Sequence, residues 1–226
     1  YIFEINNLSN KLKNNNKKLG EVVEITRGLE IGKDKISKEE TNRKIIFGED
    51  IGKYVIKNIN FIDEGTYQNF KKNDDIFKQE KIMIRETGNK LTVAYDNNGL
   101  LTNRSLYCIR SKDFDLFYLL GILNSRLIQY YYENQYKSDT DIFPKIRIGQ
   151  VKEIPIPDNT DRQIINQIIV LVKEMIQTQK NICDAKSDSD KSMFEKKINM
   201  INDKIDKLVY NLYGLTEDDI KTIEGE

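Results

Sequence analysis

The spacing of apolar residues changes near residue 113 and divides the chain into a strand-rich part and a helix-rich part. Between residues 19 and 112 the apolar residues form short runs separated by Gly, Asn and Asp, which is typical of short strands joined by tight turns. Residues 96–99 give the clearest turn, because Asn and Gly tolerate positive φ. The expected strands cover residues 19–25, 44–47, 54–61, 81–85, 91–96 and 105–110. We therefore expect a mostly antiparallel β lobe.

Residues 113–136 carry apolar side chains every three or four positions, the period of a helix that packs one side on the sheet. Two longer helices are predicted after Pro157, one from an N-cap at Asp161 to about residue 184 and one over about 191–213. Alternating steps of three and four residues predict a coiled-coil seam, and the short loop between the helices makes them antiparallel. The seam residues are Ile165, Ile168, Val172, Met175, Ile182, Phe194, Ile198, Ile201, Ile205, Leu208 and Leu212.

The two ends of the chain add smaller signals. Gly214 is expected to close the second long helix, and Thr216 and Asp219 have the spacing of a capping box for a last short helix. Residues 1–18 are polar and aperiodic and do not begin with Met, so we expect a linker or frayed helix from an upstream part of a longer chain. The sequence predicts an α+β fold with three parts. These are the linker at 1–18, a β-rich lobe with a packed helix at 19–157, and an antiparallel two-helix coiled-coil hairpin with a short C-terminal helix at 158–226.

Composition narrows the class of protein. Of the 226 residues, 38% are hydrophobic and 32% are charged, as in a globular protein. No apolar run approaches the roughly 20 residues of a membrane-spanning helix, and the first residues lack the basic and apolar regions of a signal peptide. We therefore expect a cytoplasmic protein with no membrane partner. The 36 basic and 36 acidic residues balance, but basic residues outnumber acidic ones over 126–152, which predicts a local basic face.

The residue types needed for common catalytic sites are missing. The chain contains no histidine, which removes the commonest general base and the commonest zinc ligand. Cys108 and Cys183 have no partner spacing and are expected to be buried thiols. Asp190, Glu195 and Lys197 imitate a magnesium-dependent nuclease site, but their position beside the apolar seam favours a solvated helix face. No catalytic or metal site is predicted.

Side chains suited to hydrogen bonding with DNA gather in the expected loops. Arg can donate two hydrogen bonds to guanine, Asn can pair with adenine in both directions, and Lys can hold phosphates. One loop follows the strand at 81–85, another precedes the strand at 105–110, and a third precedes residue 143. The candidate DNA-binding residues are Arg85, Thr87, Asn89, Lys90, Asn103, Arg104, Lys137, Ser138, Thr140, Lys145 and Arg147. For each of them the alternative is an ordinary turn or surface role.

Several short motifs occur in a fixed order along the chain. They are residues 33–35, 85–90 and 119–125, the Phe-Pro-Lys-Ile-Arg-Ile-Gly-Gln segment at 143–150, the Ile-Pro-Ile-Pro segment at 154–157 and the Leu-Tyr-Gly-Leu-Thr-Glu ending at 212–217. On these motifs the chain resembles the TaqI-like specificity domain. That domain is the target-recognition part of type IIG restriction-modification enzymes and related adenine-specific DNA methyltransferases. The resemblance covers about residues 19–224, with 19–157 as the DNA target-recognition domain.

The resemblance implies that the chain binds double-stranded DNA and contacts the methyltransferase or nuclease domain of the same parent chain. It would direct adenine methylation, with or without cleavage, by that catalytic part. S-adenosylmethionine and Mg would serve the parent enzyme. No cofactor is expected in this chain, which lacks the glycine-rich donor loop and the Asn/Asp-Pro-Pro-aromatic loop of an adenine methyltransferase.

Three other interpretations remain open. The chain could be half of a type I restriction specificity subunit, whose spacer helices resemble the predicted hairpin. It could be a coiled-coil protein-interaction module with weak self-association, or an enzyme of another type. A single lobe with the ending at 212–217 favours type IIG.

Overall fold

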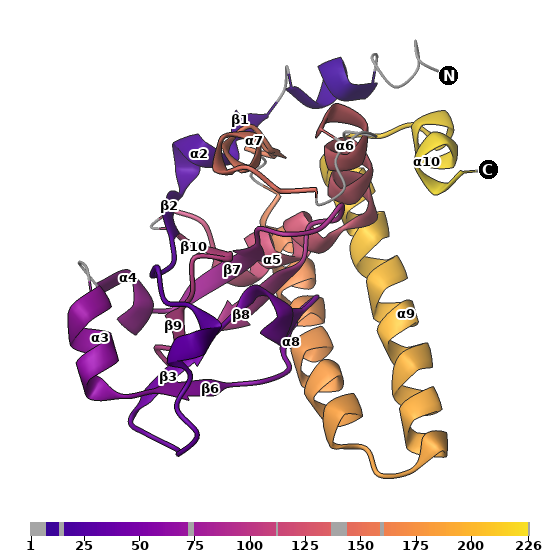
Figure 1. Ribbon diagram of the computed structural model, residues 1–226. Helices are drawn as coiled ribbons and strands as arrows, with labels where there is room; N and C mark the ends of the chain where they lie inside the picture. Colours follow the sequence, from indigo (N-terminus) through magenta and orange to yellow (C-terminus); the bar gives the residue numbers. More distant parts are fainter. Residues whose placement is uncertain are drawn as a thin grey trace.

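The computed structural model describes residues 8–13, 16–71, 75–111, 113–136, 144–158 and 161–225. It has the predicted α+β architecture: small β-sheets lie beside a long hairpin of helices α8 (Arg162–Asp184) and α9 (Asp188–Leu212) (Figure 1). Helix α5 (Leu116–Asn124) lies between the sheets and the hairpin and contacts both.

The central sheet has four strands in the order β2-β10-β7-β8, and all neighbouring strands are antiparallel. The strands are β2 (Glu24–Arg27), β7 (Lys81–Arg85), β8 (Val93–Asp96) and β10 (Leu106–Arg110). Successive side chains point to opposite faces of a strand. Ile82 and Ile84 therefore join a first core with α5 and the hairpin, whereas Met83 and Cys108 join a second core. Both faces of this sheet are covered.

A smaller sheet in the order β6-β3-β9 contributes to the second core. Its strands are β3 (Arg43–Ile46), β6 (Asn60–Ile62) and β9 (Leu101–Thr102), with β3 and β9 parallel. Two short ladders join β4 (Ile51–Gly52) to β5 (Val55–Ile56), and β1 (Lys17–Lys18) to β11 (Pro155–Ile156). The short helices are α3 (Glu64–Phe70), α4 (Asp75–Lys78), α7 (Ile148–Lys152) and α10 (Glu217–Glu224), with 3-10 turns at Lys33–Lys35 and Gly48–Asp50.

A fully buried ion pair crosses the central sheet. Lys81 of β7 and Asp96 of β8 are register partners, and both side chains are completely inaccessible to solvent. Lys81 Nζ donates to the Asp96 carboxylate and, at 2.8 Å, to the Phe77 carbonyl. Asp96 also accepts the N–H groups of Asn98 and Leu100, each at 2.9 Å. These bonds hold the predicted turn at 96–99, where Gly99 has φ of +68°.

Three expected elements differ from the structure. Residues 54–61, expected as one strand, contribute to β5 and β6, which belong to different sheets. Residues 19–22, expected as the start of a strand, form α2 (Leu19–Val22), because Leu19 is buried and its N–H donates to the Ile154 carbonyl at 2.8 Å. The helix expected over 113–136 is interrupted at Ser125, which has extended backbone angles and separates α5 from α6 (Arg126–Tyr136). Ser125 Oγ donates to the Ile122 carbonyl at 2.6 Å and thereby ends α5.

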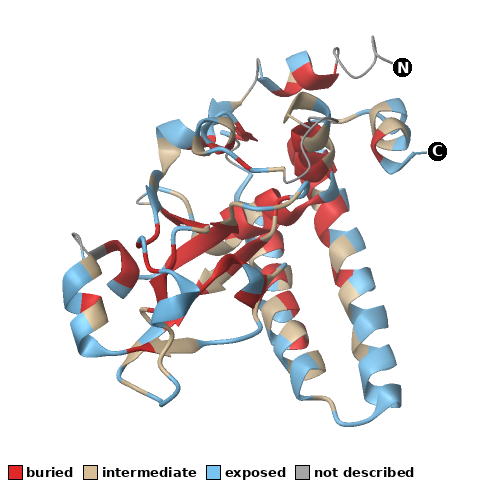
Figure 2. Ribbon diagram, in the orientation of Figure 1, coloured by how far each residue is buried: buried red, intermediate tan, exposed pale blue. Residues whose placement is uncertain are grey.

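The helical hairpin confirms the predicted caps and most of the seam. Asp161 accepts the N–H groups of Gln163 and Ile164 at 3.0 and 3.1 Å, as predicted. Helix α9 begins at Asp188, earlier than the expected start at about 191, because Ser187, which was not predicted as a cap, accepts the Asp190 N–H at 3.0 Å. Burial is concentrated in the half of the hairpin near the sheet, and the far end is exposed (Figure 2). The buried seam residues are Ile168, Val172, Met175, Ile201, Ile205 and Leu212. Cys108 is buried as expected, but the expectation for Cys183 is wrong, since it lies exposed near that far end.

The chain after α9 follows the predicted signals. Gly214 has φ of +61°, a left-handed conformation that favours glycine after a helix. Thr216 Oγ1 accepts the Asp219 N–H at 3.2 Å, and the Asp219 carboxylate accepts the Thr216 N–H at 2.9 Å, which completes the capping box of α10.

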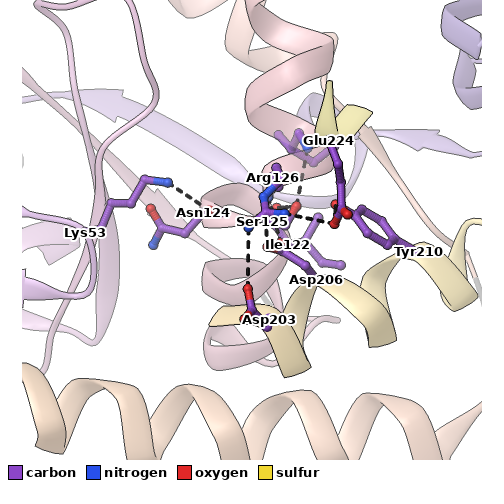
Figure 3. Close-up of polar contacts among 10 residues, drawn as sticks. Lys53, Ile122, Asn124, Ser125, Arg126, Asp203, Asp206, Tyr210 and Glu224 are labelled. Carbon is purple, nitrogen blue, oxygen red and sulfur yellow. Dashed lines mark hydrogen bonds and ion pairs between the residues drawn. The ribbon is translucent and has the colours of Figure 1, made fainter. Parts of the chain in front are cut away.

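A polar network joins the hairpin to the helix break at Ser125 (Figure 3). The Arg126 N–H donates to the Asp206 carboxylate at 2.8 Å, and the Arg126 guanidinium pairs with Glu224 at 2.8 Å. Burial raises the pKa of the Asp206 carboxyl. Lys53, which precedes β5, donates to the Asn124 carbonyl at 3.1 Å. The first core contains residues from both sides of position 157, the predicted boundary between lobe and hairpin. The two parts therefore pack as one body. The division of the chain into three parts stays a prediction.

Candidate nucleic-acid interface

Four segments that are distant in the sequence meet at one end of the central sheet, and we call their shared surface the loop face. The segments are residues 27–30, 85–90, 103–105 and 144–147. Antiparallel pairing places the ends of β2 and β7 beside the start of β10. The Gly28 N–H donates to the Leu106 carbonyl at 3.0 Å, and the Glu86 N–H donates to the Ser105 carbonyl at 2.8 Å. The loops therefore continue the hydrogen bonding of the sheet.

Residues 144–147 pair through main-chain hydrogen bonds with the segment that follows β7. Thr87 and Lys145 form an antiparallel bridge. The Gly88 N–H donates to the Pro144 carbonyl at 3.0 Å, and the Ile146 N–H donates to the Glu86 carbonyl at 2.7 Å. Two groups of predicted DNA-binding residues are thus brought side by side, although almost sixty positions separate them in the sequence.

The candidate residues around β7 differ in accessibility. The Arg85 side chain lies at the end of the strand and is partly buried, whereas Thr87 and Asn89 are exposed. Lys145 and Arg147 are exposed on the neighbouring segment, and Arg147 is the N-cap residue of α7. Arginine, asparagine and lysine side chains therefore share one solvent-facing surface.

Two further cations lie at the rim and have acidic neighbours. Lys90 Nζ lies 3.5 Å from the Glu133 carboxylate, and Arg104 Nη1 lies 3.0 Å from the Glu30 carboxylate. Their side chains are 70% and 63% exposed. Exposed ion pairs contribute at most about 1 kcal/mol to stability. Lys90 and Arg104 can therefore leave their carboxylate partners for another ligand at a small cost in free energy.

Asn103 does not lie on the accessible surface. Its side chain is buried, Nδ2 donates to the Ile31 carbonyl, and Oδ1 accepts the Ser105 N–H at 2.7 Å. The amide group therefore stabilises the turn before β10, and we leave Asn103 out of the proposed DNA contacts. Lys137, Ser138 and Thr140 lie outside the described residues.

Arg27, which the sequence analysis did not select, lies on the loop face at the end of the edge strand β2. Its Nη2 donates to the Glu86 carboxylate at 2.5 Å, and its Nε donates to the Arg104 carbonyl at 2.9 Å. The hydrogen bond to Glu86 raises the pKa of the Arg27 guanidinium. The single proton of the Tyr107 hydroxyl lies between two acceptors, the Ile146 carbonyl at 3.0 Å and the same carboxylate at 3.3 Å from Oη. The sequence around Arg27 offered only one signal for a role in binding, an arginine at the end of a strand. Its partner Glu86 lies 59 positions away and could not be inferred from the neighbouring residues.

The described residues offer little for other chemistry. They contain no group of three or more His, Cys, Asp or Glu side chains that could hold a metal ion. Asp190, Glu195 and Lys197 are exposed on α9, and Lys197 pairs with Glu174 of α8 at 2.9 Å. None of the helices in the described part of the chain combines the length and apolar character that a bilayer crossing requires.

Comparison with protein families identifies the architecture. The model of the TaqI-like C-terminal specificity domain matches residues 43–156, which is half of the chain. The chain belongs to this family. The matched residues run from β3 to β11 and include three of the four loop-face segments. The specificity domain is the DNA-recognition part of restriction-modification enzymes, which confirms the predicted class of function.

The chain is also similar to several individual proteins. A Methanocaldococcus jannaschii protein named for a type II restriction enzyme and methyltransferase is 28% identical over 207 residues, which cover 86% of this chain. This chain spans only 17% of the length of that relative. The type IIL restriction-modification enzyme MmeI, solved in complex with DNA, has a TM-score of 0.58 at 12% identity, covering 92% of this chain and 36% of MmeI. A type I S subunit from M. genitalium has a TM-score of 0.48 at 20% identity, covering 75% of this chain and 42% of the subunit.

Proposed function

We propose that this specificity domain reads a short sequence in the major groove of double-stranded DNA with its loop face. The meeting of residues 85–90, 103–105 and 144–147 at one sheet end carries this proposal. Main-chain hydrogen bonds fix the spacing between side chains from different segments. A fixed spacing suits the major groove, where each base pair presents a distinct pattern of donors and acceptors.

The side chains divide into two proposed roles. Phosphate contacts carry affinity and orientation, whereas contacts to base edges carry sequence information. The proposed phosphate contacts are Lys137, Lys145 and Arg147, and the proposed base contacts are Arg85, Asn89 and Arg104. Thr87, Lys90, Ser138 and Thr140 stay candidates for either role.

We further propose that the parent is a type IIG enzyme, in which the domain directs an adenine-specific methyltransferase, with or without a nuclease. This proposal is supported by the name of the M. jannaschii relative, which includes a methyltransferase. S-adenosylmethionine and Mg would act in the catalytic part of the parent chain. The hairpin α8–α9, which shares its core with the recognition sheet, would set the distance between the bound DNA and that part.

The test is a salt titration of DNA binding by alanine variants of the two groups, in the parent enzyme where the domain alone binds weakly. Lys145→Ala or Arg147→Ala should weaken binding to cognate and scrambled duplexes alike. Each should flatten the slope of log affinity against log salt by about 0.9, because one fewer counterion is released. Arg85→Ala or Asn89→Ala should cost about 1–3 kcal/mol on the cognate duplex alone, because a bidentate contact distinguishes base edges.

Lys196→Ala is the matched control, since Lys196 is exposed on the far part of α9. It should change neither the salt slope nor the site preference. Wild-type affinity, salt slope and site preference in all four loop-face variants would show that DNA binds elsewhere.

A further inference from the structure

Arg27 is held at two points and still has free hydrogen-bond donors. A guanidinium carries five N–H groups. Nε is occupied by the Arg104 carbonyl and Nη2 by the Glu86 carboxylate. No hydrogen bond of Nη1 is found within the described residues, so three N–H groups are left for a ligand. The side chain is 44% exposed, whereas that of Glu86 is only 13% exposed.

The two contacts orient Arg27 from both neighbouring loops. Glu86 follows β7 and Arg104 precedes β10, so the guanidinium bridges the segments that contain the proposed base contacts. The main chain of Glu86 is itself fixed, because its N–H donates to the Ser105 carbonyl at 2.8 Å and its carbonyl accepts the Ile146 N–H at 2.7 Å. Arg27 therefore loses little side-chain freedom when it binds a ligand.

The charges around Arg27 favour a base edge over a phosphate. Glu86 lies within hydrogen-bonding distance, and Glu30 follows three residues later on the same segment. A guanidinium that is already neutralised by a carboxylate adds little to the attraction of the DNA backbone, which depends on released counterions. Its remaining donors keep their direction, and the O6 and N7 atoms of guanine accept two such donors side by side.

We propose that Arg27 is a specificity-determining residue that reads a guanine in the major groove, and that Glu86 is its positioning residue. The proposal rests on the proposed function of the loop face. It assigns the contact to a strand-end residue outside the part of the chain that matches the family model.

The experiment is a binding selection from a pool of DNA duplexes with a randomised central segment, followed by affinity measurements on the selected duplex. The proteins are the wild type and the variants Arg27→Ala, Arg27→Lys, Glu86→Ala and Glu86→Gln. The wild type should select a sequence that contains guanine. Arg27→Ala should lose the preference for one guanine by about 5- to 150-fold and keep the other positions, because the donor pair is removed. Arg27→Lys should lose part of this preference, because an ammonium lacks the planar fork that holds Glu86 and the Arg104 carbonyl while it presents further donors in a fixed direction.

The Glu86 variants separate positioning from a general structural role. Glu86→Ala should lose selectivity at the same guanine as Arg27→Ala, and Glu86→Gln should keep part of it, because the amide oxygen still accepts from Nη2. Arg110→Ala is the control, since Arg110 lies at the opposite end of β10 and contacts Gln79. It should leave the selected sequence unchanged. Thermal denaturation checks folding, and Arg27→Lys carries the comparison if Arg27→Ala is unfolded.

The remaining outcomes distinguish this inference from the proposed function. A wild type that selects no sequence overturns both. A wild type that selects a sequence while the Arg27 variants keep the same guanine preference overturns the role of Arg27 alone. A uniform loss of affinity in Arg27→Ala, with a salt slope that is flatter by about 0.9, makes Arg27 a phosphate contact and overturns base reading.

Discussion

Gly121 sets the distance between α5 and α8, and substituting it tests how tightly the hairpin packs on the recognition sheet. A Cβ atom added at Gly121 would lie 2.8 Å from Cγ2 of Ile168 and 2.9 Å from Cγ2 of Val172. In open helical space, Gly→Ala stabilises a protein by up to about 1 kcal/mol through helix propensity. Overpacking a core destabilises it by about 1–3 kcal/mol. Gly121→Ala should therefore lower the free energy of unfolding by up to about 2 kcal/mol.

Gly149 of α7 provides the matched control, because a Cβ atom there meets nothing within 4 Å. Gly149→Ala should leave stability unchanged or raise it by up to about 1 kcal/mol. The difference between the two substitutions isolates the steric repulsion at Gly121. Urea denaturation followed by circular dichroism measures both, and an unchanged m value shows that only stability has changed.

A double mutant identifies the neighbour that causes the repulsion. Val172→Ala alone should destabilise the chain by about 1.6 kcal/mol or more, from two buried carbons at about 0.8 kcal/mol each plus the cavity that remains. In the Gly121→Ala background the same change should have a smaller effect, by about 0.5 kcal/mol or more, because the new methyl group enters the vacated space. If Gly121→Ala stabilises as much as Gly149→Ala, or if the two effects simply add, the close packing of α5 on α8 is refuted.

Two further predictions concern buried charges, measured by denaturant titration. Lys81→Met should lower the free energy of unfolding by about 3–5 kcal/mol because it leaves Asp96 buried and unpaired. Adding Asp96→Asn should restore part of this loss, and no restoration would contradict the buried charge as its cause. Burial raises the pKa of the Asp206 carboxyl, so ionisation of this group destabilises the folded state. The free energy of unfolding of the wild type, compared with that of Asp206→Asn, should therefore fall as the pH rises above about 4. Asp203→Asn, which removes an exposed carboxylate near the same Arg126, is the control, and an equal pH dependence in it would refute the role of burial.

The hairpin could be predicted well because its signals are local. Asp161 caps α8 through the N–H groups two and three residues later, and the capping box of α10 spans four residues. The period of three and four residues places Ile168 and Ile205 in the core without knowledge of their partners. The break at Ser125 was missed because the apolar period continues on both sides of it. The division into two helices is evident only from the hydrogen bonds of Ser125, whose Oγ donates to the Ile122 carbonyl and accepts the Ile128 N–H.

The loop face shows the opposite case. The sequence indicates that the 85–90 and 144–147 segments are polar, but the hydrogen bonds that join them connect positions almost sixty residues apart. Asn103 was selected for its side-chain chemistry, yet the surrounding turn occupies both ends of its amide group. Arg27 was passed over because its role depends on Glu86, on another strand. Residue type predicts what a loop can bind, whereas tertiary contacts decide which side chains are free to bind it.

The two-sided burial of the central sheet leaves its end, and not its faces, open for the proposed DNA contacts. Because the faces of β7 and β10 belong to two cores, a substitution there changes packing energy in both. Exposed positions such as Asn89 contact neither core, so their substitution should change stability by no more than about 0.5 kcal/mol. Asn103 differs, because its loss would leave the Ser105 N–H and the Ile31 carbonyl without a partner. The fold therefore allows the side chains proposed to contact bases to vary, while the residues that hold the loops, and the hairpin packed on the first core, keep the orientation of the loop face constant.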